Sequence, residues 1–294
     1  MKGFISAIIP VYNDPEGIKT TLESLISQNY PRDRFEITVV DNNSSDNTLD
    51  IVGGFIKRYP KNVSLLVEDK IQSSYAARNK AIQVAKGEVL AFIDSDMWAD
   101  KSWFSVISAS FKDDKVGYLG FSIEIHPTGK SLAGIYNKLT GFPVEEYMNQ
   151  RHFAGAGCIA VRKSVFKKVG LFDQKLISGG DSEFGNRVWE AGIGQIFIGG
   201  DLLHHPARES VSSLFKKEFR IGRGHRQLRN HFPLKNLLPP NPLKFFDRRF
   251  YSEKDLKISD FSKADILILY LLGLGSKVTR NLGYFYEAIK NEQK

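Results

Sequence analysis

The sequence predicts an α/β protein with a mostly parallel central sheet flanked by helices. Short apolar runs alternate with helical patterns through residues 4–93, and three of the four runs end in a polar cluster. Strands joined through helices make right-handed crossovers and lie parallel in one sheet. Ligands bind beyond the carboxyl ends of such strands, so we expect the three polar clusters to lie at one edge and form a site.

The predicted elements follow one another regularly up to residue 93. The apolar runs predict strands at 4–11, 35–40, 63–67 and 89–93. Between them, the spacing of apolar residues predicts a first helix around 18–26. A second helix follows the polar residues 41–46 and ends near residue 58, and a third covers 74–86 and is ended by Gly87. The polar clusters after the first, second and fourth strands are Tyr12-Asn13-Asp14, Asp41-Asn42-Asn43 and Asp94-Ser95-Asp96.

The second half of the chain is less regular. Its apolar runs predict strands at 117–125, 156–161 and 195–198. Helical patterns are found at 181–191, 210–230 and 264–290. The proline-rich segment 236–242 predicts a break in regular structure.

Two carboxylates one residue apart, Asp94 and Asp96, directly follow the strand predicted at 89–93. Hard cations such as Mg²⁺ or Mn²⁺ take oxygen ligands of this kind, and phosphate oxygens complete the shell. The same pattern is also typical of a solvated turn with a helix cap. The pair becomes a site only if other parts of the chain bring their side chains to it.

Several classes of protein are excluded by missing motifs. No Gly-x-Gly-x-x-Gly follows the first strand, and the chain has no Walker loop, zinc-ligand spacing or Gly-x-Ser-x-Gly elbow. The single cysteine, Cys158, rules out an intramolecular disulfide and fits a reducing compartment. Because Cys158 stands among small and apolar residues, we expect a buried thiol rather than a nucleophile.

Five short motifs occur in order along the chain. They are Pro10-Val-Tyr-Asn13, Val40-Asp41-Asn-Asn-Ser-Ser-Asp46, Ala77-Arg78-Asn79, Phe92-Ile-Asp94-Ser-Asp96 and Gly180-Asp181-Ser-Glu183-Phe-Gly-Asn-Arg187. In this order and spacing they resemble the motifs of family 2 glycosyltransferases, over about residues 4–230. The resemblance implies the GT-A fold, a nucleotide-diphospho-sugar donor and transfer with inversion.

The resemblance also implies roles for single residues in a donor site. Asp41 resembles the carboxylate that reads the nucleotide base, and Arg78 the basic residue beside the base and diphosphate. Asp94 matches the position near the ribose and Asp96 the ligand of a divalent metal, Mn²⁺ or Mg²⁺. The expected nucleotide-sugar-binding residues are Pro10, Tyr12, Asp41, Arg78, Asp94, Ser95 and Gly157.

Asp181 is the candidate general base. Inversion in a single displacement needs a carboxylate opposite the leaving group that deprotonates the acceptor hydroxyl. An aspartate at a helix start also serves as an N-cap, and the two roles are compatible. The chain departs from the family at this motif, because the family's usual Glu-Asp is Gly180-Asp181 here. The missing glutamate puts the fine adjustment of the basicity of Asp181 in doubt more than the identity of Asp181 as the base.

Two histidines, His204 and His205, precede Pro206. Many relatives have a single His just before such a proline, and in some of them it is the third metal ligand. We favour His205 because it directly precedes the proline. The sequence does not decide between the two histidines, and a structural role is the alternative for either.

Basic charge is concentrated in residues 206–294, which hold 18 Lys and Arg against 9 Asp and Glu. With an apolar stripe along 264–290, this charge predicts contact with an anionic membrane surface or a homodimer contact; a solvated helix face is the alternative. Aromatic residues are sparse beside the charges, so no nucleic-acid partner is expected. The longest apolar run, 266–274, is shorter than the roughly 20 residues of a spanning helix, so we expect a cytoplasmic protein at the inner face of the plasma membrane.

The sequence therefore predicts a GT-A catalytic domain at 1–230 and a C-terminal extension at 231–294 with a helical, membrane-associated tail. The expected activity is metal-dependent, inverting transfer of a single hexose-like sugar to a glycan or lipid-linked acceptor. The Gln-x-x-Arg-Trp motif of processive synthases is absent. The alternative from another class is a non-catalytic sugar-nucleotide or membrane-binding module with a decayed site. The presence of Asp96, Asp181 and Arg187 argues against such decay.

Overall fold

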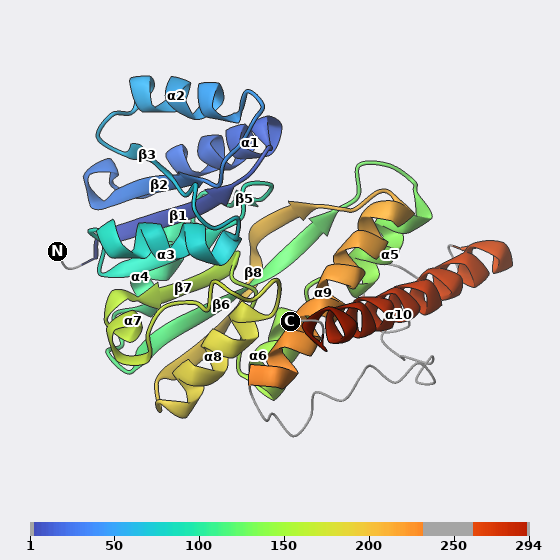
Figure 1. Cartoon of the computed structure of the whole chain (residues 1–294). Helices are drawn as coiled ribbons and strands as arrows, with labels where there is room; N and C mark the ends of the chain where they lie inside the picture. Colours follow the sequence, from blue (N-terminus) through green and yellow to red (C-terminus); the bar gives the residue numbers. More distant parts are fainter. Residues whose placement is uncertain (1–2, 232–260, 293–294) are drawn as a thin grey trace. The chain divides into compact units, whose positions relative to one another are not determined.

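The computed structural model describes residues 3–231 and 261–292 (Figure 1). The predicted break at 236–242 lies outside the described residues. The chain forms two compact units. Unit 1 comprises Met1–Glu124, Phe142–Lys175 and Gly180–His205, and unit 2 comprises Ile125–Gly141, Leu176–Gly179 and Pro206–Lys294.

Unit 1 begins with four parallel strands in the spatial order β3-β2-β1-β4. Their bounds are Ile5–Val11 for β1, Phe35–Asp41 for β2, Val63–Val67 for β3 and Val89–Ile93 for β4. The connecting helices are α1 (Pro15–Ile26), α2 (Thr48–Arg58) and α3 (Ser74–Val84), and a short 3₁₀ turn, η1, covers Arg32–Arg34. The strands and helices predicted for residues 4–93 are therefore confirmed.

The register of these strands places their carboxyl ends at one edge of the sheet. Val11, the last residue of β1, lies opposite Asp41, and Ile8 lies opposite Phe92 near the end of β4. The polar clusters that follow β1, β2 and β4 therefore leave the sheet at the same edge. Every residue of β1, β2 and β4 is buried, as expected for strands covered on both faces.

The other half of the sheet is antiparallel and completes the strand order β3-β2-β1-β4-β7-β6-β8-β5. Its strands are β5 (Trp98–Ala99), β6 (Val116–His126), β7 (Cys158–Arg162) and β8 (Gly194–Pro206). The helices here are α4 (Trp103–Ser110), α6 (Val144–Arg151), α7 (Lys163–Val169) and α8 (Gly180–Glu190). The strand predicted at 195–198 was too short, because β8 continues through a glycine-rich, half-exposed stretch without an apolar run.

Large side chains fill the core of unit 1 around the sheet. The largest fully buried ones include Trp103, Tyr118, Phe92, Phe104 and Phe184. Trp103 stacks on Phe104 with ring centroids 5.5 Å apart and has no exposed surface, so it is a core residue and cannot line a ligand site.

In the described residues of unit 2, the helices are α5 (Leu132–Thr140), α9 (Val211–His231) and α10 (Lys263–Glu292). Apolar side chains of all three helices form one buried cluster: Ala133, Tyr136, Leu139, Leu214, Leu269 and Leu272. Helices α9 and α10 approach closely at Gly222 and Gly283, where a Cβ would collide with a backbone carbonyl of the other helix. Arg223 of α9 donates to the buried Glu287 of α10 over 2.8 Å, which ties the pair further.

Candidate active site

The loops after β1 and β2 are tied to one another at the carboxyl edge of the sheet. Asn13 has a positive φ of 49°, and its side chain accepts a hydrogen bond from the Ser45 amide over 2.8 Å. Asp41 is 1% exposed, and its Oδ2 accepts from the amides of Asn43 and Ser44. Its Oδ1 is buried with no partner among the described residues. A buried carboxylate oxygen left open in this way is suited to accept a hydrogen bond from a ligand.

Arg78 and Asp94 form an ion pair between α3 and the end of β4. Arg78 is buried and its Nε has no partner among the described residues, whereas the Asp94 side chain is 43% exposed. The backbone of Gly157 packs against the Asp94 carboxylate, so closely that a Cβ at position 157 would lie 2.5 Å from the Asp94 Cγ. Only glycine leaves room here for the carboxylate.

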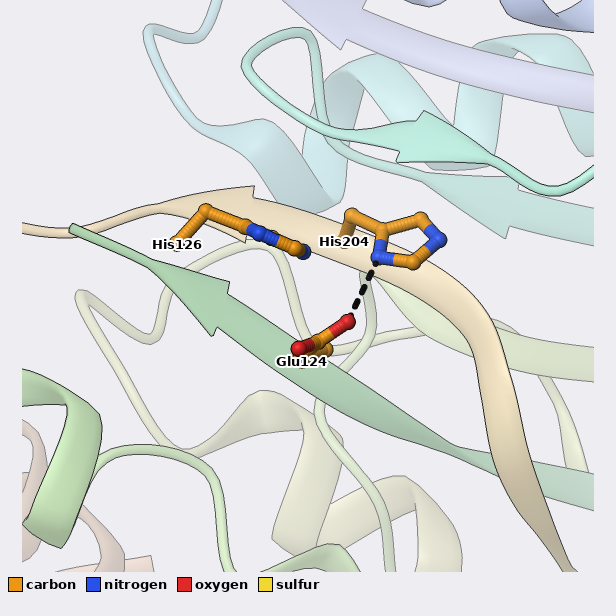
Figure 2. A group of neighbouring side chains, drawn as sticks. All are labelled: Glu124, His126 and His204. Atoms are coloured by element: carbon orange, nitrogen blue, oxygen red, sulfur yellow. Dashed lines mark ion pairs between the residues drawn. The ribbon is translucent and has the colours of Figure 1, made fainter. Parts of the chain in front are cut away.

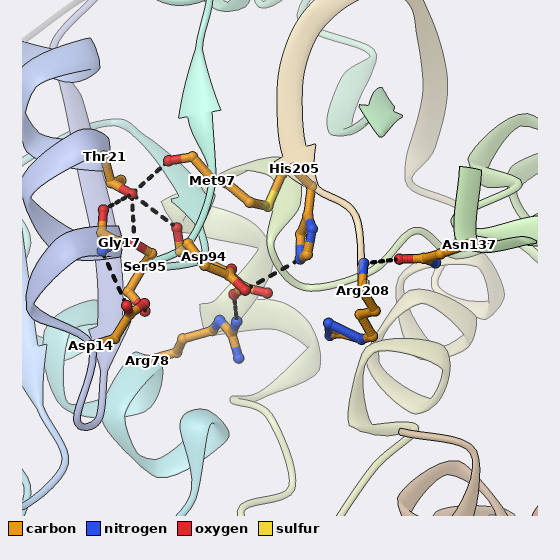
Figure 3. Close-up of polar contacts among 11 residues, drawn as sticks. Asp14, Gly17, Thr21, Arg78, Asp94, Ser95, Met97, Asn137, His205 and Arg208 are labelled. Atoms are coloured by element: carbon orange, nitrogen blue, oxygen red, sulfur yellow. Dashed lines mark hydrogen bonds and ion pairs between the residues drawn. The ribbon is translucent and has the colours of Figure 1, made fainter. Parts of the chain in front are cut away.

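Helix α1 holds the loop that carries Asp94, Ser95 and Asp96 (Figure 3). The Thr21 hydroxyl lies 2.8 Å from the Ser95 carbonyl oxygen and 2.5 Å from that of Met97. The Ser95 hydroxyl donates to Asp14 over 2.9 Å, and Asp14 also caps α1 by accepting from the Gly17 amide. The two carboxylates therefore project from a loop that is fixed at several points.

The two adjacent histidines of β8 pair with different carboxylates. His205 Nε2 lies 3.3 Å from Asp96 Oδ2, and the histidine is 4% exposed (Figure 3). His204 Nδ1 lies 3.3 Å from Glu124 of β6 (Figure 2), and its ring stacks on Trp98. Successive side chains of a strand point to opposite faces, which separates the two histidines. His126, two positions after Glu124, emerges on the same face of β6 as that glutamate.

Asp181 stands in the first turn of α8 and is half-buried. The Ser182 amide donates to its carboxylate over 2.9 Å, and a Cβ added at Gly155 would lie 3.8 Å from its Oδ2. Burial raises the pKa of the Asp181 carboxyl, and the Ser182 amide and the positive charge of Arg78 oppose this rise in pKa. A carboxylate with a raised pKa is a stronger base than an ordinary aspartate.

Tyr75 of α3 explains why a glycine precedes Asp181. A Cβ at Gly180 would lie 2.9 Å from the Tyr75 ring, so the tyrosine fills the space of a side chain at position 180. The Tyr75 hydroxyl also accepts a hydrogen bond from the Gly180 amide over 3.0 Å. The start of α8, and with it Asp181, is therefore held by α3, the same helix that carries Arg78.

Cys158 is a buried thiol, as the sequence predicted. Burial raises its pKa, and the negative charges of Asp94 and Asp181 raise it further. A Cβ added at Gly155 would lie 3.8 Å from both the Cys158 sulfur and the Asp181 Oδ2. A thiol held neutral in this way is no nucleophile.

The structure brings the predicted residues to one edge of the sheet in unit 1. Pro10 is paired in β1 opposite Val40, Tyr12 is 51% exposed just beyond β1, and Ser95 is fixed to Asp14. Sequence reasoning named Asp14 only as part of the polar cluster after the first strand, and it missed Tyr75, which holds the start of α8. A usable signal existed for Tyr75, which precedes Arg78 by three positions on one helix face.

Comparison with known proteins places the chain in a family. It matches the model of glycosyl transferase family 2 over residues 6–170, and it belongs to that family. It is 37% identical to the glycosyltransferase AglE of Haloferax volcanii over 226 residues, 76% of this chain and 74% of AglE. It is also 37% identical to a poly(ribitol-phosphate) β-glucosyltransferase of Bacillus spizizenii, over 39% of this chain and 19% of that protein. The chain is thus a glycosyltransferase.

Solved structures of low sequence identity share the fold. The mannosyltransferase PcManGT of Pyrobaculum calidifontis, in complex with GDP-Man and Mn²⁺, superposes with a TM-score of 0.67 at 18% identity, over 95% of this chain and 86% of that one. S. aureus TarS 1–349 in complex with UDP-GlcNAc superposes with a TM-score of 0.57 at 18% identity, over 99% and 92% of the two chains. The chain therefore has the GT-A fold that its motifs imply.

Proposed function

We propose that this glycosyltransferase moves a single sugar from a nucleotide-diphospho-sugar to a glycan or lipid-linked acceptor, with inversion and with a divalent metal. The observation that carries this proposal is the convergence of Asp41, Arg78, Asp96 and Asp181 at one edge of the sheet. Each has a different environment, and each environment suits a different part of the donor or of the reaction. In their complexes, PcManGT holds GDP-Man with Mn²⁺ and TarS holds UDP-GlcNAc.

The nucleoside end of the donor would lie at Asp41. Its buried, unpartnered Oδ1 requires a hydrogen-bond donor, which the N–H of a nucleobase supplies. The exposed ring of Tyr12, which follows β1, offers a face on which a base stacks. Asp94 is held by Arg78 yet remains 43% exposed, so it can accept from a ribose hydroxyl.

The diphosphate end fits a metal held by Asp96 and His205. One carboxylate oxygen and one imidazole nitrogen 3.3 Å apart form a mixed donor set, which suits Mn²⁺ better than Mg²⁺ because Mg²⁺ prefers oxygen alone. A bound divalent ion would neutralise the negative charge of the departing nucleoside diphosphate. Arg78 adds a fixed positive charge from the protein itself.

Asp181 would deprotonate the acceptor hydroxyl. Its raised pKa increases its basicity, and the Ser182 amide and Arg78 keep the carboxylate form accessible. The Tyr75–Gly180 contact fixes the helix start from which it projects. Positioning of this kind is part of catalysis because a displaced base loses its alignment with the attacking oxygen.

A donor panel tests the proposal. Thermal unfolding would be followed with UDP-, GDP- and dTDP-sugars, each with and without Mn²⁺, followed by product analysis with candidate acceptors. We expect at least one donor to raise the unfolding temperature only when Mn²⁺ is present. Asp96→Asn should abolish this metal-dependent rise, whereas Asp201→Asn, at an exposed position of β8, should not. The proposal fails if no donor stabilises the wild-type protein in a metal-dependent way.

A further inference from the structure

Helix α10 exposes an apolar stripe along its length, opposite the side that packs on α5 and α9. In the part of the chain that the structure describes, every exposed side chain from Leu267 to Ile289 is apolar or aromatic. The exposed residues are Leu267, Ile268, Tyr270, Leu271, Val278, Leu282, Phe285, Tyr286 and Ile289. With a rise of 1.5 Å per residue, the stripe is about 33 Å long. A continuous apolar surface of this size marks an interaction site.

The exposed charged side chains that are described in unit 2 all have the same sign. Among the described residues of unit 2, the charged side chains classed as exposed are Lys130, Lys216, Arg220, Arg229, Lys263 and Lys290. The described acidic side chains are at most half-exposed, and each is bonded within the unit. Glu209 accepts from Ser131, Glu218 from Arg280, Asp265 from Ser262 and Glu287 from Arg223.

The cations of unit 2 also crowd one another. Lys217 is half-buried, and desolvation, together with the nearby positive charges of Arg208, Arg280 and Arg220, lowers its pKa to about 8 against the opposing effect of the Glu218 charge. Positive charge gathered beyond what internal partners neutralise attracts a polyanionic surface. A partner of unit 2 must therefore offer an apolar region for the stripe and negative charges for the cations. An anionic bilayer supplies both, in its acyl chains and its headgroups.

We propose that α10 is an interfacial helix that seats unit 2 on an anionic lipid bilayer, with its apolar stripe among the acyl chains and the cations of α9 and α10 at the headgroups. No helix in the described ranges is long and apolar enough to cross a membrane. A helix with an apolar face and flanking cations lies in the plane of the interface instead. Tyr270 and Tyr286 border the stripe, and tyrosine rings favour the boundary between acyl chains and water.

Flotation of the full-length protein with lipid vesicles tests this proposal. Vesicles of phosphatidylcholine alone would be compared with vesicles that also contain phosphatidylglycerol, at about 0.05 M and about 0.5 M salt. We expect flotation with the anionic vesicles at low salt and a clear loss at high salt. Leu282→Asp with Phe285→Asp should reduce partitioning more than tenfold. The matched control is Val84→Asp on α3 of unit 1, where the valine is 57% exposed against 58% and 54% for the two targets.

A second pair of variants tests the charges. Lys216→Ala with Arg220→Ala should lower partitioning roughly 25-fold, at about fivefold for each cation removed near an anionic surface. Lys57→Ala with Lys61→Ala, exposed cations of unit 1, should leave partitioning unchanged. Unfolding temperatures would confirm that all variants fold.

Two results would overturn the proposal. The first is a wild-type protein that fails to float with anionic vesicles at low salt. The second is a lipid-free wild-type dimer in sedimentation equilibrium that Leu282→Asp with Phe285→Asp converts to a monomer, because a second copy of the chain would then cover the stripe.

Discussion

Replacement of Asp181 by asparagine separates the chemistry of the site from its architecture. The amide has nearly the shape of the carboxylate and can still accept from the Ser182 amide, but it cannot take a proton. A positioned general base contributes about 10²–10⁴-fold to the rate. We therefore expect Asp181→Asn to lower kcat by that factor, which corresponds to about 2.7–5.4 kcal/mol of transition-state stabilisation. Binding of the donor should change little.

The same substitution should not destabilise the protein at neutral pH. Because burial raises the pKa of Asp181 in the folded state, the ionised carboxylate opposes folding at pH values above that raised pKa. The wild-type protein therefore loses stability as the pH rises through the raised pKa, and the neutral asparagine variant does not. We expect Asp181→Asn to unfold at an equal or higher temperature at pH 7, and this advantage to disappear towards about pH 4.

The assay is release of nucleoside diphosphate in the presence of an acceptor, with unfolding temperatures measured in parallel across pH. Asp201→Asn, an aspartate exposed on β8, is the control for removal of a negative charge. Transfer at the wild-type rate by Asp181→Asn would refute the reasoning and place the base elsewhere. A variant that loses both transfer and donor binding would show that Asp181 supports the fold of the site and not the proton transfer.

Three further predictions concern the donor and the metal. His205→Ala should raise the Mn²⁺ concentration needed for half-maximal activity at least about tenfold, whereas His204→Ala, whose histidine pairs with Glu124, should not; equal effects would contradict the assignment. Asp41→Asn should weaken donor binding by about 1–3 kcal/mol, because it changes the carboxylate oxygen that would accept a hydrogen bond from the nucleobase. Unchanged donor affinity in calorimetry would exclude that role of Asp41. Gly157→Ala should cost about 1–3 kcal/mol of stability, because the new Cβ would collide with the Asp94 carboxylate. The control is Gly53→Ala in α2, where a Cβ would have no atom within 4 Å, and it should be neutral or stabilising. Equal melting curves for the two variants would contradict the close packing of Gly157 on Asp94.

The carboxyl edge of the sheet was predictable because the parallel direction of the strands follows from general rules. Alternating strands and helices imply parallel neighbours, and this alone brings Asp41 and Asp94 to one edge. No further contact information was needed. The long helices α9 and α10 were predictable for a similar reason, since their apolar spacing is regular over many turns.

Contacts between segments distant in the chain were not predictable from periodicity or spacing, and only the family resemblance suggested that His205 lies near Asp96. Pairing of His205 with Asp96 depends on how far β8 extends and on the side-chain alternation along it, and the glycine pair in the middle of β8 hides both. The contact between Tyr75 and Gly180 is a matter of shape across 105 residues, which leaves no pattern in the sequence. Short helices such as α6 and α7 also lack enough turns to show a period.

The central claim, single displacement with an acceptor activated by Asp181, is tested most directly by the stereochemistry of the product. The donor and acceptor that the panel identifies would be incubated with the wild-type enzyme, and the anomeric configuration of the new linkage would be determined by proton NMR. The account predicts a linkage of configuration opposite to that of the sugar in its donor. A product that keeps the donor's configuration would contradict it, because one displacement at the anomeric carbon cannot retain the configuration.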